Sequence, residues 1–253
     1  GIQSTTNATR QSTEEELTQK AARALDEMMH FGVTTCEAKS GYGLATEHEL
    51  KALQVIKNLN DRHHMDIVAT FMGAHLVPAE YKANRAEYIR LVCEEMMPKV
   101  KEQGIAKYCD VFCEADTFTV EESRQVLEAG LKYGLRPKIH ADEIEAIGGS
   151  VLAGEIGAIS AEHLIVCPPE GIESMARGGV VACLLPATSF YLGATFAPAR
   201  DMVNAGVPVA MATDFNPGSC PCLNLQFVIN LGCLKYKLTP EEVLTAVTLN
   251  AAA

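Results

Sequence analysis

Short apolar segments alternate with longer amphipathic segments along the whole chain. Seven apolar segments favour strands, and they lie at 33–38, 66–75, 108–116, 136–143, 158–166, 180–187 and 208–215. Between them, apolar positions recur with the three-to-four-residue period of an amphipathic helix. Short strands separated by helices predict βαβ units and a parallel sheet.

The ends of the predicted helices support this division. Five of them are followed by a glycine, the residue that most easily adopts the left-handed conformation that closes a helix: Gly104, Gly134, Gly157, Gly179 and Gly206. The strand–helix unit recurs at intervals of about 23–38 residues, which is typical of a (β/α)8 barrel. The fold class that we predict is therefore α/β, a TIM-type barrel.

The first predicted helix, "STEEELTQKAARALDEMMHFG", has no strand before it. Ser12, with Glu15 three residues later, has the pattern of a capping box at its start. Seven strands are one fewer than a closed barrel requires. We therefore expect residues 1–253 to be one barrel domain that is incomplete at both ends, with the first strand upstream.

Composition and charge narrow the class of function. The chain is 48% hydrophobic and carries a net charge of −11 without a cluster of lysine or arginine, so nucleic acid is an unfavourable partner and a small-molecule substrate is expected. The chain contains no run of 18 apolar residues, so no membrane span is expected, and its polar start is unlike a signal peptide. The nine cysteines are scattered through apolar segments, which is typical of reduced thiols in a cytoplasmic protein.

Titratable and polar side chains gather where the predicted strands end. In a (β/α)8 barrel these carboxyl ends form one mouth, where the chemistry takes place. The segment "LRPKIHADE" is the clearest case, because an apolar strand stops on an imidazole and two carboxylates. The residues placed in this way are Glu37, Lys39, Tyr42, His75, Glu114, Asp116, His140, Asp142, Glu143, Glu162, His163, Asp214 and Asn216.

Histidines on two neighbouring strands and an aspartate on the last strand indicate a metal site. His140, His163 and Asp214 match the ligand set of a metal-assisted hydrolase barrel, and imidazole with carboxylate suits Zn²⁺ or Fe²⁺. Such a metal lowers the pKa of bound water to about 7. Taken singly, each residue has a structural alternative: a strand-end histidine is often only hydrogen-bonded, and Asp142 is a candidate helix cap.

Five motifs, in order and each at a strand end, resemble those of the imidazolonepropionase family within the amidohydrolase superfamily. They are "EAKSGYGL" (37–44), "FMGAHLVP" (71–78), "KIHADE" (138–143), "AEHL" (161–164) and "TDFNPGS" (213–219). The resemblance implies metal-dependent hydrolysis of the ring C–N bond of 4-imidazolone-5-propanoate, which yields N-formimidoyl-L-glutamate in histidine degradation. It also implies one Zn²⁺ or Fe³⁺ per subunit and a homodimer.

The same resemblance assigns roles to residues of this chain. His140 and Asp214 would be metal ligands, and Glu143, His163 and Asp214 would be catalytic. The substrate would be bound by Tyr42, His75, Glu143, Asn216, Gly218 and Ser219. We also expect the backbone N–H groups of the "NPGS" turn to form an anion-binding nest for the propanoate.

The chain departs from the family pattern in one respect. The H-x-H metal pair at the end of the first strand, the substrate arginine after it and the small β-sandwich are not in this sequence. Two alternatives therefore stay open. One is another amidohydrolase, such as a deaminase or a cyclic amidase, because a fold does not choose a substrate. The other is a catalytically inactive barrel that serves as a binding or scaffold protein.

Overall fold

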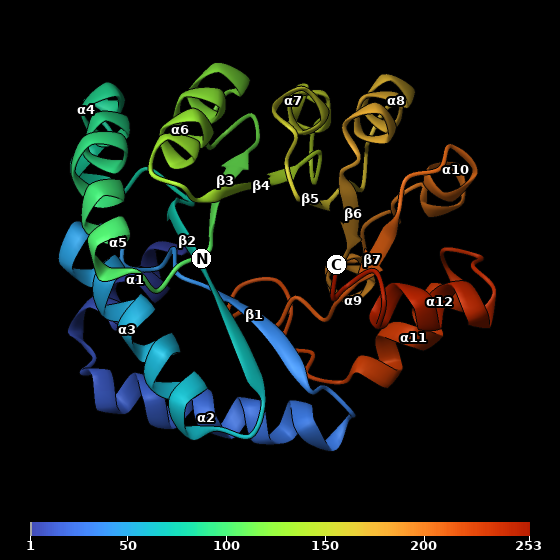
Figure 1. The fold of residues 1–253 in the computed structure, drawn as a ribbon, viewed down its shortest axis with the longest axis horizontal. Coiled ribbons are helices and arrows are strands. Elements are labelled where there is room, and N and C mark those ends of the chain that lie inside the picture. The colour runs from blue at the N-terminus through green and yellow to red at the C-terminus, as the bar shows by residue number, and fades with distance from the viewer. Residues whose placement is uncertain (1) are drawn as a thin grey trace. The chain divides into compact units, whose positions relative to one another are not determined.

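The computed structural model describes residues 2–253 and confirms the predicted alternation of strands and helices (Figure 1). Seven strands occur, and their order in the sheet is their order in the chain. The chain divides into two compact units. The first runs to Phe112 and includes Glu121–Pro137, and the second comprises Cys113–Val120 and Lys138–Ala253. The two units are described separately below.

In the first unit, strand β1 pairs with β2 and β2 pairs with β3, all in parallel. The register of the second pair shifts between Phe71 and Ala74, just before the segment that carries His75. The elements are α1 (Ile2–Gln11), α2 (Glu14–His30), β1 (Thr35–Lys39), α3 (Thr46–Arg62), β2 (Asp66–Ala74), η1 (Ala79–Tyr81), α4 (Arg85–Leu91), η2 (Val92–Met96), α5 (Met97–Gln103), β3 (Tyr108–Cys113) and α6 (Val120–Lys132).

In the second unit, β4 pairs with β5, β5 with β6 and β6 with β7, again in parallel. Figure 1 shows α7 and α8 side by side along one face of these strands. The elements are β4 (Arg136–Ala141), α7 (Gly149–Ile156), β5 (Ser160–His163), α8 (Pro169–Gly178), β6 (Val181–Leu184), α9 (Pro186–Leu192), α10 (Ala199–Asn204), β7 (Val209–Met211), α11 (Leu225–Leu234) and α12 (Pro240–Val247).

The start of the chain differs from the sequence prediction. The N-cap of α2 is Thr13, which forms a reciprocal capping box with Glu16, so the predicted pair Ser12–Glu15 is wrong by one residue. The physical reason is that Ser12 ends α1: its hydroxyl donates to the carbonyl of Ala8 at 2.9 Å and is not available to cap α2. The helix α1 itself was not predicted, because its apolar positions are too few to form a stripe.

The helix ends behave as predicted. Gly104, Gly134, Gly157, Gly179 and Gly206 all have a left-handed backbone, with φ between 64° and 81°. All nine cysteines are free thiols. Within residues 2–253, no helix combines the length and the apolar character that crossing a membrane would require.

Glycines also allow α7 and α8 to pack in direct contact. A Cβ on Gly154 would lie 2.2 Å from the carbonyl oxygen of Ser174, and a Cβ on Gly171 would lie 2.0 Å from the Ser150 hydroxyl. The Ser174 hydroxyl donates to the carbonyl of Val151 at 3.0 Å. This close contact fixes the two helices that follow β4 and β5, the strands that end in the candidate site.

Candidate active site

The loop after β4 carries the first group of predicted site residues. His140 is buried near the end of the strand, with 9% of its surface exposed, and Glu143 follows three residues later. Between them Asp142 has φ +52°, a left-handed conformation that is uncommon for a residue with a side chain. This turn ends the strand and directs the chain into the loop 143–148.

His163 reaches His140 because its backbone leaves the strand conformation. In the pair β4–β5 the register partner of His140 is Glu162, whereas His163 lies opposite Ala141. Because side chains alternate between the faces of a sheet, a regular strand would turn His163 away from His140. Its φ of +69° instead rotates the Cα–Cβ bond out of that alternation, and the two imidazole rings approach to 5.3 Å between centroids.

Glu143 faces the same histidine. Its Oε2 lies 3.6 Å from Nε2 of His163, and both side chains are largely buried, with 14% and 4% of their surface exposed. A carboxylate and an imidazole at this distance can exchange a proton through a small movement or one bridging atom. The structure therefore brings together His140, Glu143 and His163, which the sequence predicted from separate strands.

Asp214 lies three residues beyond β7 and also has a left-handed backbone, with φ +55°. Thr188, a fully buried residue of α9, donates its hydroxyl to Oδ2 of Asp214 at 2.6 Å. This contact fixes one carboxylate oxygen of the predicted metal ligand and orients the other. No sequence signal indicated Thr188, because it follows the predicted strand 180–187 in a segment for which no element was predicted.

Asn216 organises the loop that follows Asp214. Its Oδ1 accepts hydrogen bonds from the backbone N–H groups of Gly218 at 2.9 Å and Ser219 at 2.7 Å. Its Nδ2 donates to the carbonyl of Asp214 at 2.9 Å and to the Ser219 hydroxyl at 3.0 Å. The N–H groups of Gly218 and Ser219, which were expected to bind an anion, thus donate to Asn216 within the loop. Asn216 therefore shapes the loop that carries the predicted substrate residues.

In the first unit, Tyr42 and His75 form a pair. Their rings meet edge to face at 5.0 Å, and Nδ1 of His75 contacts the carbonyl oxygen of Gly41 at 2.9 Å. Gly41 has φ +108°, and a Cβ there would lie 2.9 Å from the carbonyl oxygen of Met72 and 3.2 Å from His75. Only glycine fits this approach, which explains the first glycine of the "SGYG" motif.

Asp142 does not cap α7 in the usual way, because Gly148 is the N-cap and no side chain caps that helix. Its carboxyl is fully buried, and this burial raises the pKa of Asp142 above its usual range. The hydroxyl and backbone N–H of Ser150, in the first turn of α7, shift the pKa in the opposite direction. Asp142 is therefore a buried group beside the helix start, behind the loop that carries Glu143.

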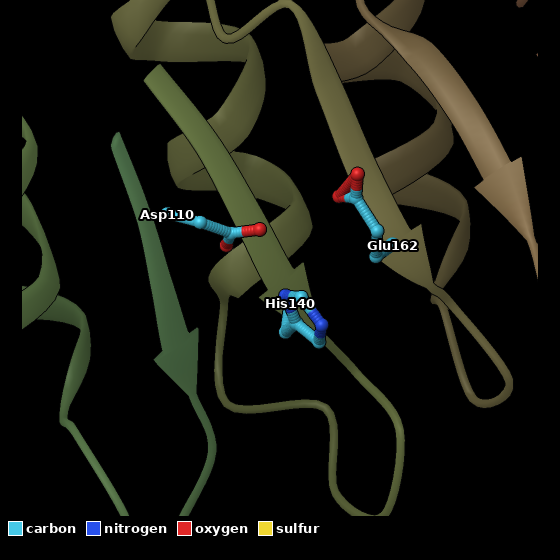
Figure 2. A group of neighbouring side chains, drawn as sticks. All are labelled: Asp110, His140 and Glu162. Carbon is cyan, nitrogen blue, oxygen red and sulfur yellow. The ribbon is translucent and has the colours of Figure 1, made fainter. Parts of the chain in front are cut away.

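Further side chains of metal-binding type lie along the strands. Figure 2 draws His140 of β4 and Glu162 of β5, which are register partners and share a face, together with Asp110 of β3. Each carboxylate has a lysine partner in its own unit: Lys39 lies 2.7 Å from Asp110, and Lys138 lies 3.0 Å from Glu162. At either carboxylate, a metal would have to compete with the lysine that is paired with it.

The predicted metal ligands, His140 and Asp214, are of types that a metal of the first transition row accepts. His140 offers a buried imidazole, and Asp214 offers a carboxylate that Thr188 already holds in one orientation. Imidazole nitrogen and carboxylate oxygen are ligands that divalent cations such as zinc accept, and a hydroxyl that orients a ligating carboxylate is typical of such sites. Glu143 faces His163, whose ring lies 5.3 Å from that of His140 between centroids.

The sequence matches the model of the amidohydrolase family over residues 2–231. This match covers most of the chain, and the chain therefore belongs to the amidohydrolase family. Membership of this family, together with the imidazole and carboxylate donors described above, indicates a site for a divalent metal.

The relatives narrow the class further. Over its whole length the chain is 57% identical to an imidazolonepropionase of Alkaliphilus metalliredigens, 54% identical to one of Geobacillus sp. and 53% identical to one of Streptococcus gordonii. The chain spans about 60% of the length of these curated relatives.

Solved structures show the same fold at low sequence identity. A guanine deaminase of C. acetobutylicum with bound guanine superposes with a TM-score of 0.75 at 16% identity, over 98% of this chain and 64% of that one. An atrazine chlorohydrolase of Arthrobacter aurescens in complex with zinc and atraton gives a TM-score of 0.73 at 15% identity, over 94% of this chain and 59% of that one. These similarities confirm the barrel-type fold class and carry no information on the substrate.

Proposed function

We propose that this chain is the main catalytic part of an imidazolonepropionase, which hydrolyses the ring C–N bond of 4-imidazolone-5-propanoate to N-formimidoyl-L-glutamate. The observation that carries the proposal is the cluster of His140, Glu143 and His163 at the ends of β4 and β5, in a chain that is more than half identical to proteins of that name. An amidohydrolase with a different substrate would share the metal donors, but it would have no reason to share this degree of identity.

His140 and Asp214 would hold the metal, with further ligands from outside this sequence. Zn²⁺ or Fe³⁺ is the cation that we propose, since both accept imidazole and carboxylate, and it would supply hydroxide and polarise the ring carbonyl when bound. Thr188 supports this role for Asp214, because it keeps one oxygen engaged at 2.6 Å and leaves the orientation of the other fixed.

The remaining steps are proton transfers by this chain's own side chains. Water adds its oxygen to the ring carbonyl carbon, and we assign its proton to the carboxylate of Asp214. The C–N bond then breaks, and the nitrogen that departs takes a proton, which leaves a carboxylate and a formimidoyl nitrogen. Glu143 would hydrogen-bond the ring N–H groups and carry the proton to that nitrogen, while His163 would orient the water or the carbonyl oxygen.

Tyr42, His75, Asn216, Gly218 and Ser219 are proposed to bind the substrate. The edge-to-face pair of Tyr42 and His75 presents a hydroxyl and an imidazole from the segments that follow the neighbouring strands β1 and β2. The Gly218 and Ser219 amides already donate to Asn216, so we propose that they act by holding the loop, with the Asn216 and Ser219 side chains nearest the ligand. The prediction of one domain over residues 1–253, a homodimer and a cytoplasmic location is kept as part of this proposal.

The test is turnover of imidazolonepropionate by the whole protein that contains this chain, with metal content and ammonia measured on the same sample. Ring opening consumes the substrate without releasing ammonia, whereas a deaminase would release one equivalent. Glu143→Gln should keep the metal and lower kcat by about 10²-fold or more, because a positioned acid–base group contributes about 10²–10⁴-fold. A metal-replete protein that turns over no imidazolonepropionate would instead favour a deaminase, another cyclic amidase or an inactive scaffold.

A further inference from the structure

A buried glutamate outside the catalytic cluster holds the loop that carries Glu143. Glu114 follows β3 and has only 2% of its surface exposed. Its Oε2 accepts the backbone N–H groups of Glu143 at 3.1 Å and Ile144 at 2.9 Å, and its Oε1 accepts that of Glu145 at 3.0 Å. Three consecutive amides therefore converge on one carboxylate from a segment about thirty residues away in the chain.

The first unit contains the same arrangement around the loop that carries Tyr42. Glu49 of α3 is fully buried, and its carboxylate accepts the backbone N–H groups of Gly41 at 2.9 Å, Gly43 at 2.8 Å and Leu44 at 2.8 Å. The carbonyl groups on the other side of this loop accept from Arg10, at 2.7 Å from Gly43 and 3.1 Å from Leu44. The loop is thus fixed on both sides.

Carboxylates are seldom buried merely to hold a loop in place. Burial of a carboxylate is unfavourable unless hydrogen bonds compensate for the lost water, and several converging amides provide that compensation. Burial raises the pKa of Glu49, and the amides of Gly41, Gly43 and Leu44 oppose the shift. A loop in which several N–H groups donate to one buried carboxylate has little freedom to change conformation. The side chains of that loop are therefore held in position.

We propose that Glu114 and Glu49 are positioning residues with separate tasks: Glu114 fixes Glu143 for proton transfer, and Glu49 fixes Tyr42 and His75 for substrate binding. This division of tasks rests on the proposed function, which assigns a catalytic role to Glu143 and substrate binding to Tyr42 and His75. Neither glutamate touches substrate in this scheme. Each acts through the backbone of its loop, and a misplacement of about 1 Å can cost about 10²-fold in rate.

The kinetic test compares Glu114→Gln with Glu49→Gln in the full chain. A glutamine at position 114 places an NH2 group against at least two backbone N–H donors in either orientation, because each oxygen of Glu114 accepts two amides. We expect Glu114→Gln to lower kcat by about tenfold or more while KM changes by less than about threefold. Glu49→Gln should raise KM by about threefold or more and leave kcat within about threefold.

Glu122→Gln is the matched control, since it removes a glutamate whose ion-pair partner is Arg85, at 2.8 Å, and not the backbone of a loop with predicted site residues. Its kcat and KM should equal those of the wild type. If both glutamate variants lower kcat and raise KM together, or if neither parameter changes, the division of tasks is wrong.

Amide hydrogen exchange separates this proposal from the proposed function, because it needs no substrate. Glu114→Gln should accelerate exchange at residues 143–145 and leave 41–44 unchanged, and Glu49→Gln should do the reverse. If the wild type fails to turn over imidazolonepropionate while the two variants show this exchange pattern, the proposed function is wrong and the two loop anchors stand. Unchanged exchange in both folded variants would overturn the anchoring itself, whatever the substrate is.

Discussion

One hydroxyl decides how Asp214 is held. Thr188→Val keeps the shape of the side chain and removes the 2.6 Å hydrogen bond to Oδ2. Partners that orient a metal ligand typically contribute about 10–100-fold to metal affinity or activity, so we expect a loss of about that size in zinc affinity or in kcat/KM. Competition with a chelator and steady-state kinetics measure the two quantities.

Ser189→Ala is the control for Thr188, because it removes a second buried hydroxyl one residue further along α9. The Ser189 hydroxyl has no hydrogen-bond partner within residues 2–253. This variant should bind zinc as the wild type does. Equal losses in the two variants would show that packing of α9, and not the contact with Asp214, is what matters.

The first glycine of the "SGYG" motif gives a second prediction at this scale. Gly41→Ala places a Cβ against the Met72 carbonyl in a left-handed backbone, so we expect a loss of about 1–3 kcal/mol in the free energy of unfolding and a higher KM. Gly32→Ala is the matched variant: its φ is +91°, but a Cβ there meets nothing within 4 Å.

For Gly32→Ala we expect only the cost of the left-handed backbone, about 1 kcal/mol, and an unchanged KM. Urea denaturation and substrate titration of both variants test the pair. A normal KM in folded Gly41→Ala protein would contradict the proposal that the Tyr42–His75 pair binds the substrate.

Residue types at strand ends led us to predict His140, Glu143 and Asp214 as site residues, but they did not show how His163 approaches His140 and Glu143. The pattern of alternating faces places Glu162 beside His140 and turns His163 away. The left-handed φ of His163 reverses that result, and no local propensity in "AEHL" indicates it. Thr188 was not predicted, and Glu114 was predicted only as a strand-end residue without its contacts, for a related reason: each acts on residues far away in the sequence that only the folded chain brings near.

At the scale of elements, α12 illustrates how a helix start responds to pH. Glu242 belongs to the capping box of Thr239 and forms an ion pair with Arg200 at 2.6 Å. The Arg200 side chain, followed by the backbone N–H of Thr239, lowers the pKa of Glu242 from 4.5 to about 2. The ionised form is therefore the one that the folded state favours.

The sign of the pH effect follows from that direction. A carboxyl with a lowered folded-state pKa stabilises the fold above its unfolded value and loses this contribution as the pH falls towards the folded value. Glu242→Gln should thus melt about 1–3 °C below the wild type at pH 6, and the difference should disappear between pH 5 and about 2.

Salt provides the control for this element. The pair is partly exposed to solvent, so about 1 M NaCl should reduce the difference in melting temperature at pH 6 by screening. A difference that persists at pH 2 would mean that Glu242 acts through packing.

Elements with a strong period were predicted well and those without one were not. Six of the seven strands lie within the predicted segments and β1 extends one residue beyond its segment, to Lys39, because the strands of a parallel sheet are largely apolar. The helix α1 escaped prediction, since Thr6 is its one fully buried residue and no apolar stripe marks it. The capping box was placed one residue early because Ser12 and Thr13 carry the same signal, and only the contact of Ser12 with Ala8 separates them.

At the scale of the whole molecule, charge opposes the proposed substrate. The chain carries a net charge of −11, and the propanoate arm is an anion. Raising the ionic strength from about 0.01 M to about 0.15 M shortens the screening length from about 30 Å to about 8 Å. We expect kcat/KM to rise by up to about threefold over this range while kcat stays constant.

An uncharged amide of the propanoate arm is the control substrate, and its kcat/KM should not respond to salt. If kcat/KM for the acid falls as salt increases, positive groups near the site outweigh the charge of the whole chain. Stopped-flow or steady-state measurements at low substrate concentration distinguish the two results.

The left-handed backbone at Asp142, His163 and Asp214 limits which sequences evolution can try at these positions. Aspartate, asparagine and histidine are the residues with side chains that most often adopt this conformation, and Asp214 is also one of the two metal ligands that we propose. Substitution of Asp214 by asparagine or glycine would keep the backbone and lose the charge, whereas glutamate would keep the charge and fit the backbone poorly. The left-handed backbone and the chemistry of the proposed site therefore favour the same few residue types. Most single substitutions at these positions would be unsuited to one or the other.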